Sequence, residues 1–316
     1  MQNIMSVRES LEQGSLDQRI KEIYVDEQRV PYNRERYIRA IDRFTELFPS
    51  EKEIEIYSAP GRSEVCGNHT DHQNGMVLAT SINLDAIAIV AKAEEPVIRL
   101  VSGDFPMEEV DVADLSMKEE EQSTTTALIR GVAAGMKERG HKVGGFTAYI
   151  TSDVLMGAGM SSSAAFESLI GTILSGLYND MKVSSIEIAQ IGQYAENIYF
   201  GKPCGLMDQM ACSVGGMIFI DFKEKEHPEV RQVHTDFEKA GLSLCIVDTK
   251  GSHADLTPDY AAVPAEMNQV AQALGREHLR EVPRETFFKE LPKLWKETSG
   301  RAVLRAIHFY EEEERV

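Results

Sequence analysis

The first fifty residues carry apolar side chains at helical spacing. Four of them fall on one face of the segment 34–48, and these are Tyr37, Ile41, Phe44 and Phe48. Apolar residues that recur every three or four positions predict an amphipathic helix, here within a strongly charged segment. We therefore expect residues 1–48 to form a helical N-terminal extension.

Beyond this extension the pattern predicts a mixture of strands and helices. Short apolar runs and alternations predict strands at 53–58, 86–91, 97–102, 144–151, 217–222 and 242–248. Helical spacing predicts helices at 127–139, after 162, from 184, and at 261–274, 285–298 and 301–313. Ser184 followed by Glu187 forms a capping box at one of these helix starts. The irregular order of strands and helices favours α+β layers over a doubly wound sheet.

Composition limits the classes of function. The chain of 316 residues, 42% apolar and 27% charged, is long enough for two ordinary domains. Its longest apolar runs are far shorter than the roughly 20 residues of a membrane-spanning helix. The net charge of −18 and the lack of a basic patch argue against nucleic acid as a partner. The four scattered cysteines form no C-x-x-C pair, and residues 1–17 have no secretory pattern, so we expect a cytoplasmic protein.

A loop rich in glycine and serine precedes one predicted helix. Residues 156–165 read MGAGMSSSAA. Gly157 and Gly159 allow a backbone to approach a ligand closely. The helix start adds free N–H groups and a positive dipole, which suit phosphates. The alternative is a glycine turn with a serine N-cap, and the segment is not a Walker A loop.

A second polar segment, residues 59–75, reads APGRSEVCGNHTDHQNG. Six of its side chains can form directed hydrogen bonds within eleven residues, and these are Arg62, Glu64, Asn68, His69, Asp71 and His72. Such donors and acceptors suit a sugar, and Arg62 could also neutralise a phosphoryl group. The alternatives are a polar surface loop or, less favoured because no zinc signature matches, a metal site at His69, Asp71 and His72.

Two carboxylates stand among apolar residues. Glu196 follows Ala195 on a predicted helix whose apolar residues indicate burial, and Asp208 lies in the segment PCGLMDQM. A buried carboxylate needs a cation or hydrogen-bond donors. Each is therefore either a salt-bridged or capping residue, or part of a site.

These segments together resemble the galactokinase branch of the GHMP kinases. APGR…GNHTDHQNG resembles the galactokinase signature, GAGMSSSAA the phosphate loop, and AEN followed by CGLMDQ the catalytic segment, in the same order. The weaker stretch GSHADLTPDY resembles a segment that ends in a sugar-contacting tyrosine. The similarity runs from about residue 53 to the end of the chain.

The resemblance implies roles for particular residues. Asp208 would be the catalytic carboxylate with Arg62 beside it, and Ser163 and Glu196 would bind magnesium. The phosphate loop would comprise Gly157, Ala158, Gly159, Met160, Ser161, Ser162 and Ser163. The sugar-contacting positions would be Asn68, His69, Asp71, Gly205 and Tyr260.

The chain also departs from the family pattern. Asn68 replaces a glutamate and His72 replaces a tyrosine, changes that bear on which sugar is used. The loop has Leu155 in place of a proline and Met160 in place of a leucine. A third glycine-rich motif near the family's C-terminus has no counterpart after Met217, so we expect an incomplete second domain and a weak or inactive form of the enzyme.

The resemblance implies a two-domain α+β fold. A domain at 49–225, shared in fold with a small-subunit ribosomal protein, would bind ATP and sugar, and 226–316 would form a partial ferredoxin-like domain, with the boundary near Pro228. The implied reaction moves the γ-phosphoryl group of ATP, with Mg²⁺, to the anomeric hydroxyl of galactose. The alternatives are a kinase for N-acetylgalactosamine or arabinose and a non-catalytic sugar sensor.

Overall fold

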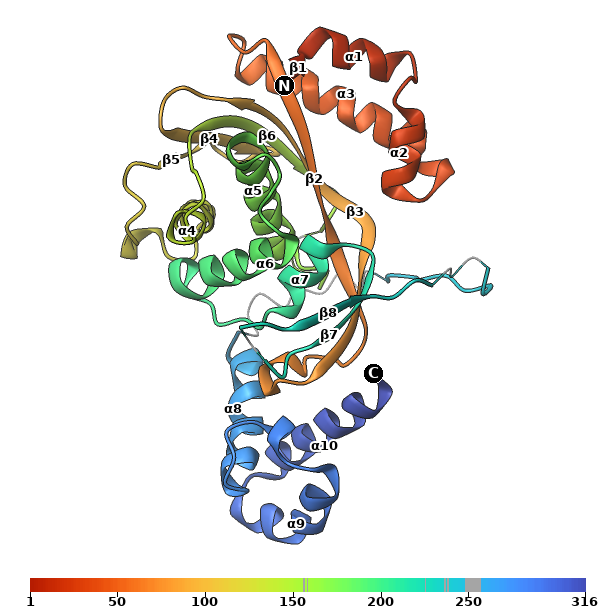
Figure 1. The fold of residues 1–316 in the computed structure, drawn as a ribbon, viewed down its shortest axis with the longest axis vertical. Helices are drawn as coiled ribbons and strands as arrows, with labels where there is room; N and C mark the ends of the chain where they lie inside the picture. Colours follow the sequence, from red (N-terminus) through yellow and green to blue (C-terminus); the bar gives the residue numbers. More distant parts are fainter. Residues whose placement is uncertain (156, 158, 225, 236, 238, 248–256) are drawn as a thin grey trace.

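An eight-stranded mixed sheet forms the centre of a computed structural model that describes residues 1–155, 157, 159–224, 226–235, 237, 239–247 and 257–316. The strands follow the order β1-β2-β3-β6-β4-β5, with β7 on β3 and β8 on β7 (Figure 1). Their bounds are β1 Gln2–Asn3, β2 Glu53–Cys66, β3 Met76–Lys92, β4 Val97–Ser102, β5 Glu108–Asp111, β6 Phe146–Ser152, β7 Met217–Asp221 and β8 Glu229–Gln232.

The long strand β3 joins the two parts of the sheet. Its second half pairs with β6, where Ala88 lies opposite Ile150, and its first half pairs with β7, where Ala79 lies opposite Ile218. Only β4 and β6 run parallel; the other pairs among the described residues are antiparallel. This topology confirms the predicted α+β class, because a doubly wound sheet would be mostly parallel.

Three N-terminal helices cover one face of the sheet, as the sequence predicts. They are α1 (Ile4–Glu12), α2 (Asp17–Tyr24) and α3 (Val30–Leu47). Ile41 and Phe44 of α3 are fully buried and pack with Ile87 and Ile89 of β3. The predicted amphipathic face of the helix is thus the one that meets the sheet.

The opposite face is covered by one helix that precedes the phosphate loop and by the helical segments that follow it. These are α4 (Thr125–Glu138), α5 (Ser162–Asn179), α6 (Ser185–Tyr194), the π-helical segment η4 (Ala195–Phe200) and α7 (Met207–Val214). One half of the predicted capping box is present, since Ser184 accepts a hydrogen bond from the backbone N of Glu187, whereas the Glu187 carboxylate contacts His141. π-Helical turns occur often at functional sites, and this one carries Glu196.

The C-terminal residues form a helical unit with its own apolar core. Its helices are α8 (Thr257–Ala273), α9 (Arg284–Glu297) and α10 (Gly300–Arg315), and short 3₁₀ turns occur at η1 Glu27–Arg29, η2 Asp71–Gln73, η3 Glu119–Glu121 and η6 Leu279–Glu281. The unit contacts the loop before η2, because Glu312 Oε2 accepts from the backbone N of Gly67 at 2.9 Å. No helix in the described part of the chain has the length and apolarity to cross a membrane.

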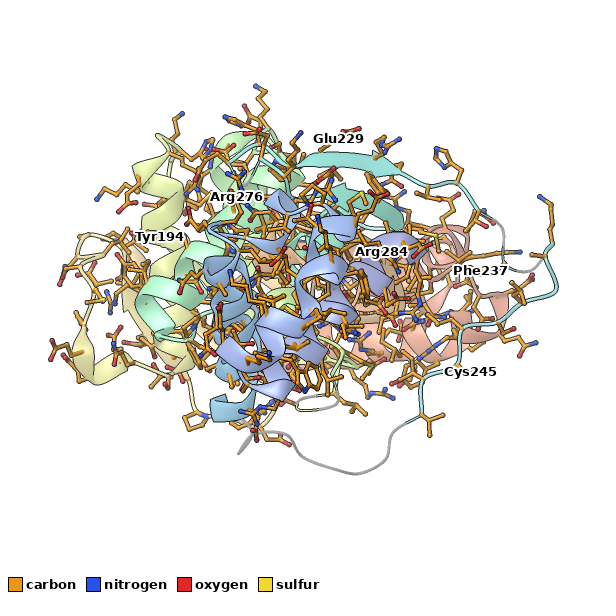
Figure 2. The ribbon with its side chains drawn as sticks, turned by 90° about the horizontal axis from the view of Figure 1, so that it is seen from below. Tyr194, Glu229, Phe237, Cys245, Arg276 and Arg284 are labelled. Atoms are coloured by element: carbon orange, nitrogen blue, oxygen red, sulfur yellow. The ribbon has the colours of Figure 1, made fainter. Side chains whose placement is uncertain are left out.

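Two features differ from the sequence-based expectation. The proposed boundary near Pro228 falls within a hairpin, because β8 pairs with β7, with Ile220 opposite Val230. The predicted strand at 242–248 is wrong for its described residues 242–247, which form no strand and expose their apolar side chains, such as Leu242 at 60%. This part of the chain lies away from the sheet (Figure 2, where Cys245 is labelled), and an alternating pattern forms a strand only where a neighbouring strand supplies hydrogen bonds.

Candidate active site

The central feature of the site is an ion pair between Arg62 of β2 and Asp208 at the start of α7. The guanidinium Nε and Nη2 donate to the two carboxylate oxygens, each at 2.8 Å. Nη1 donates to the backbone oxygen of Gly159 at 2.7 Å, and Ser161 Oγ donates to Asp208 Oδ2 at 2.5 Å. The pair thus links the phosphate loop to α7 with fixed, bidentate geometry.

The surroundings of Asp208 keep it ionised. Burial alone would raise the pKa of its carboxyl, but the charge and hydrogen bonds of Arg62 and the Ser161 hydroxyl outweigh burial and lower the pKa below its ordinary value. A carboxylate with a lowered pKa is a weak proton acceptor. The arrangement therefore favours a role in orienting a hydroxyl and balancing charge over one as a strong general base.

The phosphate loop is held against β2 by close backbone contact. Arg62 N donates to Met160 O at 3.2 Å, and a side chain at Gly61 would meet that same oxygen at 2.9 Å. Gly159 and Ser161 both have left-handed backbones, with φ of 73° and 57°. Ser161 is the N-cap of α5, and its hydroxyl reaches Asp208 instead of its own helix.

The remaining described loop residues lie next to the start of α5. Gly157 has φ of 71°, and Ser162 and Ser163 form the first turn of α5. Ala158 lies outside the described residues. The start of an eighteen-residue helix therefore follows the glycine loop directly, which is the arrangement that binds phosphates.

Glu196 forms the centre of a second group beside the loop. It is 3% exposed, and its Oε1 accepts from Ser163 Oγ and from Lys202 Nζ, both at 3.3 Å. Burial alone would lower the pKa of Lys202, but Glu196 raises it above its ordinary value. Nothing in the sequence singles out Lys202, since a lysine after a helix is usually a solvated residue.

Gln209 connects Glu196 to a further buried carboxyl, Glu167. Gln209 Nε2 donates to Glu196 Oε2 at 2.9 Å and to Glu167 Oε2 at 3.1 Å. Burial and the neighbouring Glu196 raise the pKa of Glu167 well above its ordinary value. Glu167 Oε1 and Gln209 Oε1 are both buried without a hydrogen-bond partner, and a protonated Glu167 can donate a hydrogen bond as well as accept one. In the sequence, Glu167 stands out only as a single charged residue inside an apolar helix.

The predicted sugar-contacting residues of the second segment meet the segment before α7. Asp71 Oδ2 accepts from Met207 N at 3.3 Å. A side chain at Gly205 would lie 1.8 Å from the same oxygen, so only glycine permits this approach. His69 has a left-handed backbone, with φ of 52°, and its N donates to Glu64 Oε1 at 2.9 Å.

Glu64 is a residue that the sequence analysis named but assigned no role. Burial raises the pKa of its carboxyl to about 7, although His69 acts to lower it. Asn68 is exposed, and its backbone is held by α10, where Glu312 Oε2 accepts from its N at 3.0 Å. Tyr260 lies in the first turns of α8 and is 52% exposed, so its predicted sugar contact stays a prediction.

Three consecutive residues of α7 reach all parts of the site. Met207 N contacts Asp71, Asp208 contacts Arg62 and Ser161, and Gln209 contacts Glu196. The described structure thus brings three parts together at one helix start. These are residues 59–75, called the sugar segment from here on, the phosphate loop, and the candidate magnesium ligands. Segments about 140 residues apart in sequence become neighbours there.

Comparison with known proteins assigns the chain to a class and then to a family. The family model described as "GHMP kinases N terminal domain" matches residues 127–216, and the one described as "Galactokinase galactose-binding signature" matches residues 42–92. A galactokinase of Streptomyces coelicolor is 32% identical over 278 residues, covering 87% of this chain and 70% of that protein. One of Actinobacillus pleuropneumoniae serotype 5b is 33% identical and covers 88% and 71%, and one of Lactobacillus helveticus is 29% identical and covers 77% and 63%.

Solved structures share the fold. A Lactococcus lactis galactokinase complexed with galactose aligns with a TM-score of 0.71 at 24% identity, over 87% of this chain and 71% of that one. The Methanococcus jannaschii mevalonate kinase aligns with a TM-score of 0.52 at 18% identity, over 77% and 80%. The fold is thus that of a GHMP kinase. Within that class, this chain belongs to the galactokinase family, which confirms the resemblance read from its motifs.

Proposed function

We propose that this protein is a sugar kinase that transfers the γ-phosphoryl group of ATP to the anomeric hydroxyl of galactose and forms galactose 1-phosphate. The carrying observation is the start of α7, where Met207, Asp208 and Gln209 contact the sugar segment, the phosphate loop and Glu196 in turn. Catalysis of phosphoryl transfer consists mainly of positioning and charge stabilisation. One rigid helix start that touches all three parts meets that requirement.

The sugar would lie against Asp71, His69 and Gly205, with its anomeric hydroxyl directed at Asp208. That carboxylate would accept the hydroxyl hydrogen bond and orient the oxygen. Arg62, held at 2.8 Å on both of its Asp208 contacts, balances the carboxylate and lies next to the phosphate loop, where negative charge shifts during transfer. Asn68 and Tyr260 are the remaining proposed sugar contacts.

ATP would bind with its phosphates at the loop formed by Gly157, Ala158, Gly159, Met160, Ser161, Ser162 and Ser163. The oxygens of Ser163 and Glu196 lie 3.3 Å apart, close to the roughly 3 Å between neighbouring ligands of an octahedral Mg²⁺ with 2.1 Å bonds. These two residues therefore fit the ion, which when bound would neutralise phosphate charge. Lys202, on the same carboxylate oxygen, would add a cation near the phosphates.

The assay measures ADP release from Mg-ATP with galactose, N-acetylgalactosamine, arabinose or no sugar. We expect weak turnover that depends on galactose, and a higher Mg²⁺ requirement in Glu196→Gln. The free cysteines are consistent with a cytoplasmic location. ATP binding without turnover on any of the sugars would contradict the proposed reaction, and a preference for another sugar would move the substrate assignment to that sugar.

A further inference from the structure

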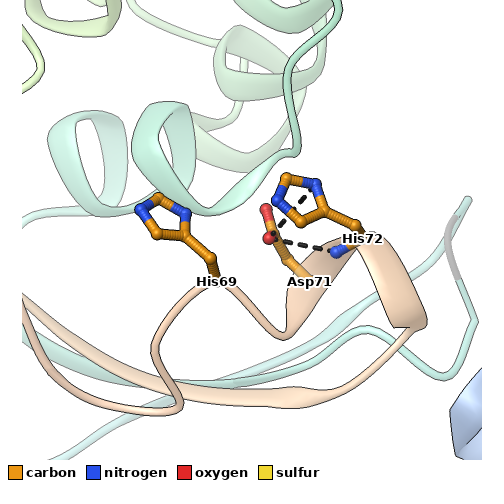
Figure 3. A group of neighbouring side chains, drawn as sticks. All are labelled: His69, Asp71 and His72. Carbon is orange, nitrogen blue, oxygen red and sulfur yellow. Dashed lines mark hydrogen bonds and ion pairs between the residues drawn. The ribbon is translucent and has the colours of Figure 1, made fainter. Parts of the chain in front are cut away.

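Two histidines and an aspartate converge at the start of η2. One ligand atom from each of His69, Asp71 and His72 lies within 4.8 Å of the other two. The two imidazole rings are nearly parallel, at 11°, with centroids 6.0 Å apart, and the Asp71 carboxylate points into the space between them (Figure 3). We propose that these three side chains bind a transition-metal cation of the zinc class.

The donor set selects the kind of ion. Two imidazole nitrogens and one carboxylate oxygen suit Zn²⁺ and its neighbours in the first transition row, whereas Mg²⁺ prefers oxygen ligands alone. Three protein ligands leave a fourth position open for water or a hydroxyl group. The site thus differs in chemistry from the oxygen pair of Ser163 and Glu196.

The geometry needs only a small adjustment to hold such an ion. Ligand atoms of a tetrahedral zinc at about 2.1 Å lie about 3.4 Å apart, and His72 Nδ1 already lies 3.7 Å from Asp71 Oδ1. The His72 side chain is 23% exposed, so it is free enough to turn toward an ion. Side-chain rotation can therefore close the remaining separation without a backbone change.

Asp71 is the fixed member of the group. Its side chain is 4% exposed, and backbone N–H groups of His72 and Met207 bind its two oxygens at 3.0 and 3.3 Å. Each oxygen has a second lone pair that can bind a metal. Glu64, which accepts from His69 N, adds a carboxyl next to the site and so favours a dication when ionised.

The site overlaps the sugar position, and this step rests on the proposed function. His69 and Asp71 would serve both ligands, so zinc and galactose should exclude one another. Glu196 and Ser163 take no part, so Mg-ATP should leave zinc binding largely unchanged. Zinc would then act as an inhibitor competitive with the sugar.

Calorimetric titration of the metal-free chain with zinc chloride, without nucleotide, tests the site directly. We expect one binding event that depends on these histidines. His72→Tyr should weaken zinc binding at least about tenfold, which is the lower end of the loss caused by removing even a supporting residue. His69→Asn should do the same, and asparagine tolerates the left-handed backbone at this position.

The matched control is His227→Tyr, an exposed histidine in the β7–β8 turn, which should bind zinc as the parent does. All these variants retain the four cysteines, so binding to thiols is common to them. Two outcomes would refute the proposed zinc site. One is an unchanged zinc affinity in both His72→Tyr and His69→Asn, and the other is an equal loss of zinc affinity in His227→Tyr. A second titration, with galactose present, tests the overlap. The apparent zinc affinity should fall as the galactose concentration rises. An unchanged zinc affinity would refute the competition, and the kinase assay would still test the proposed function separately.

Discussion

Replacing Asp208 with asparagine changes the central contact of the site with almost no change in shape. The native carboxylate accepts two hydrogen bonds from Arg62 at 2.8 Å and one from Ser161 at 2.5 Å. Asparagine keeps one accepting oxygen and places an NH₂ group opposite one of these donors. The variant therefore loses the charge and at least one hydrogen bond, while the volume stays the same.

The expected losses follow from the burial of the pair. Breaking a buried ion pair costs about 3–5 kcal/mol of stability. The side chain of Arg62 is 10% exposed and that of Asp208 33%, so water offsets part of this, and we expect about 1–3 kcal/mol. Loss of correct positioning of a reacting group can cost about a hundredfold in rate, or about 2.7 kcal/mol of barrier. Asp208→Asn should thus lower kcat by at least about a hundredfold.

Three measurements separate these effects. ADP release gives kcat, calorimetry with ATP gives nucleotide affinity, and thermal unfolding shows that the variant is folded. We expect nucleotide affinity to stay within a few-fold of the parent. Asp180→Asn, at an exposed carboxylate, is the matched control and should leave all three unchanged. A folded Asp208→Asn that keeps kcat within about tenfold, about 1.4 kcal/mol, would show that this carboxylate does not act on the hydroxyl.

Substitutions at three other residues test neighbouring parts of the site. Gly205→Ala would place a carbon 1.8 Å from Asp71 Oδ2, so sugar KM should rise at least about tenfold with little change in ATP binding, and an unchanged KM would contradict the contact. The pKa of Glu64 in the folded protein, about 7, lies above the ordinary value of 4.5. The contribution of the Glu64 carboxyl to the free energy of unfolding is therefore complete below pH 4.5 and is lost as the pH rises to 7. The melting temperature of the parent minus that of Glu64→Gln should therefore fall across this window, and a difference constant with pH would refute the shift. Glu167→Gln mimics a protonated carboxyl and should melt within a few degrees of the parent. Glu167→Ala should lose about 2–4 kcal/mol of stability. Equal losses of stability in the two variants would show that Glu167 is ionised.

The local elements were largely predictable from the chain. The helix around Tyr37 and Phe44, the strand at 97–102 and the loop before α5 follow from side-chain spacing and from glycine, which act over a few residues. The three motifs and their order were sufficient to indicate the family. These are properties of short segments, and neighbouring residues alone decide them.

Longer-range features were not predictable in the same way. The polar stretch around Pro228 predicts a domain boundary, but β8 begins at its end, because β7 offers a hydrogen-bonding edge there. The segment 242–247 has the alternation of a strand but lies exposed, since no described neighbour pairs with it. A strand depends on its partner, and the partner is set by the tertiary fold.

The site shows the same division. The sequence determined which residues could do the chemistry: Arg62, Asp71, Glu196 and Asp208 all stood out by type and setting. The family resemblance implied that Arg62 lies beside Asp208, 146 positions away. Only the tertiary structure decided that the contact is bidentate and that it lowers the pKa of the carboxyl. Burial and charge proximity are properties of packed surfaces and have no counterpart in local spacing.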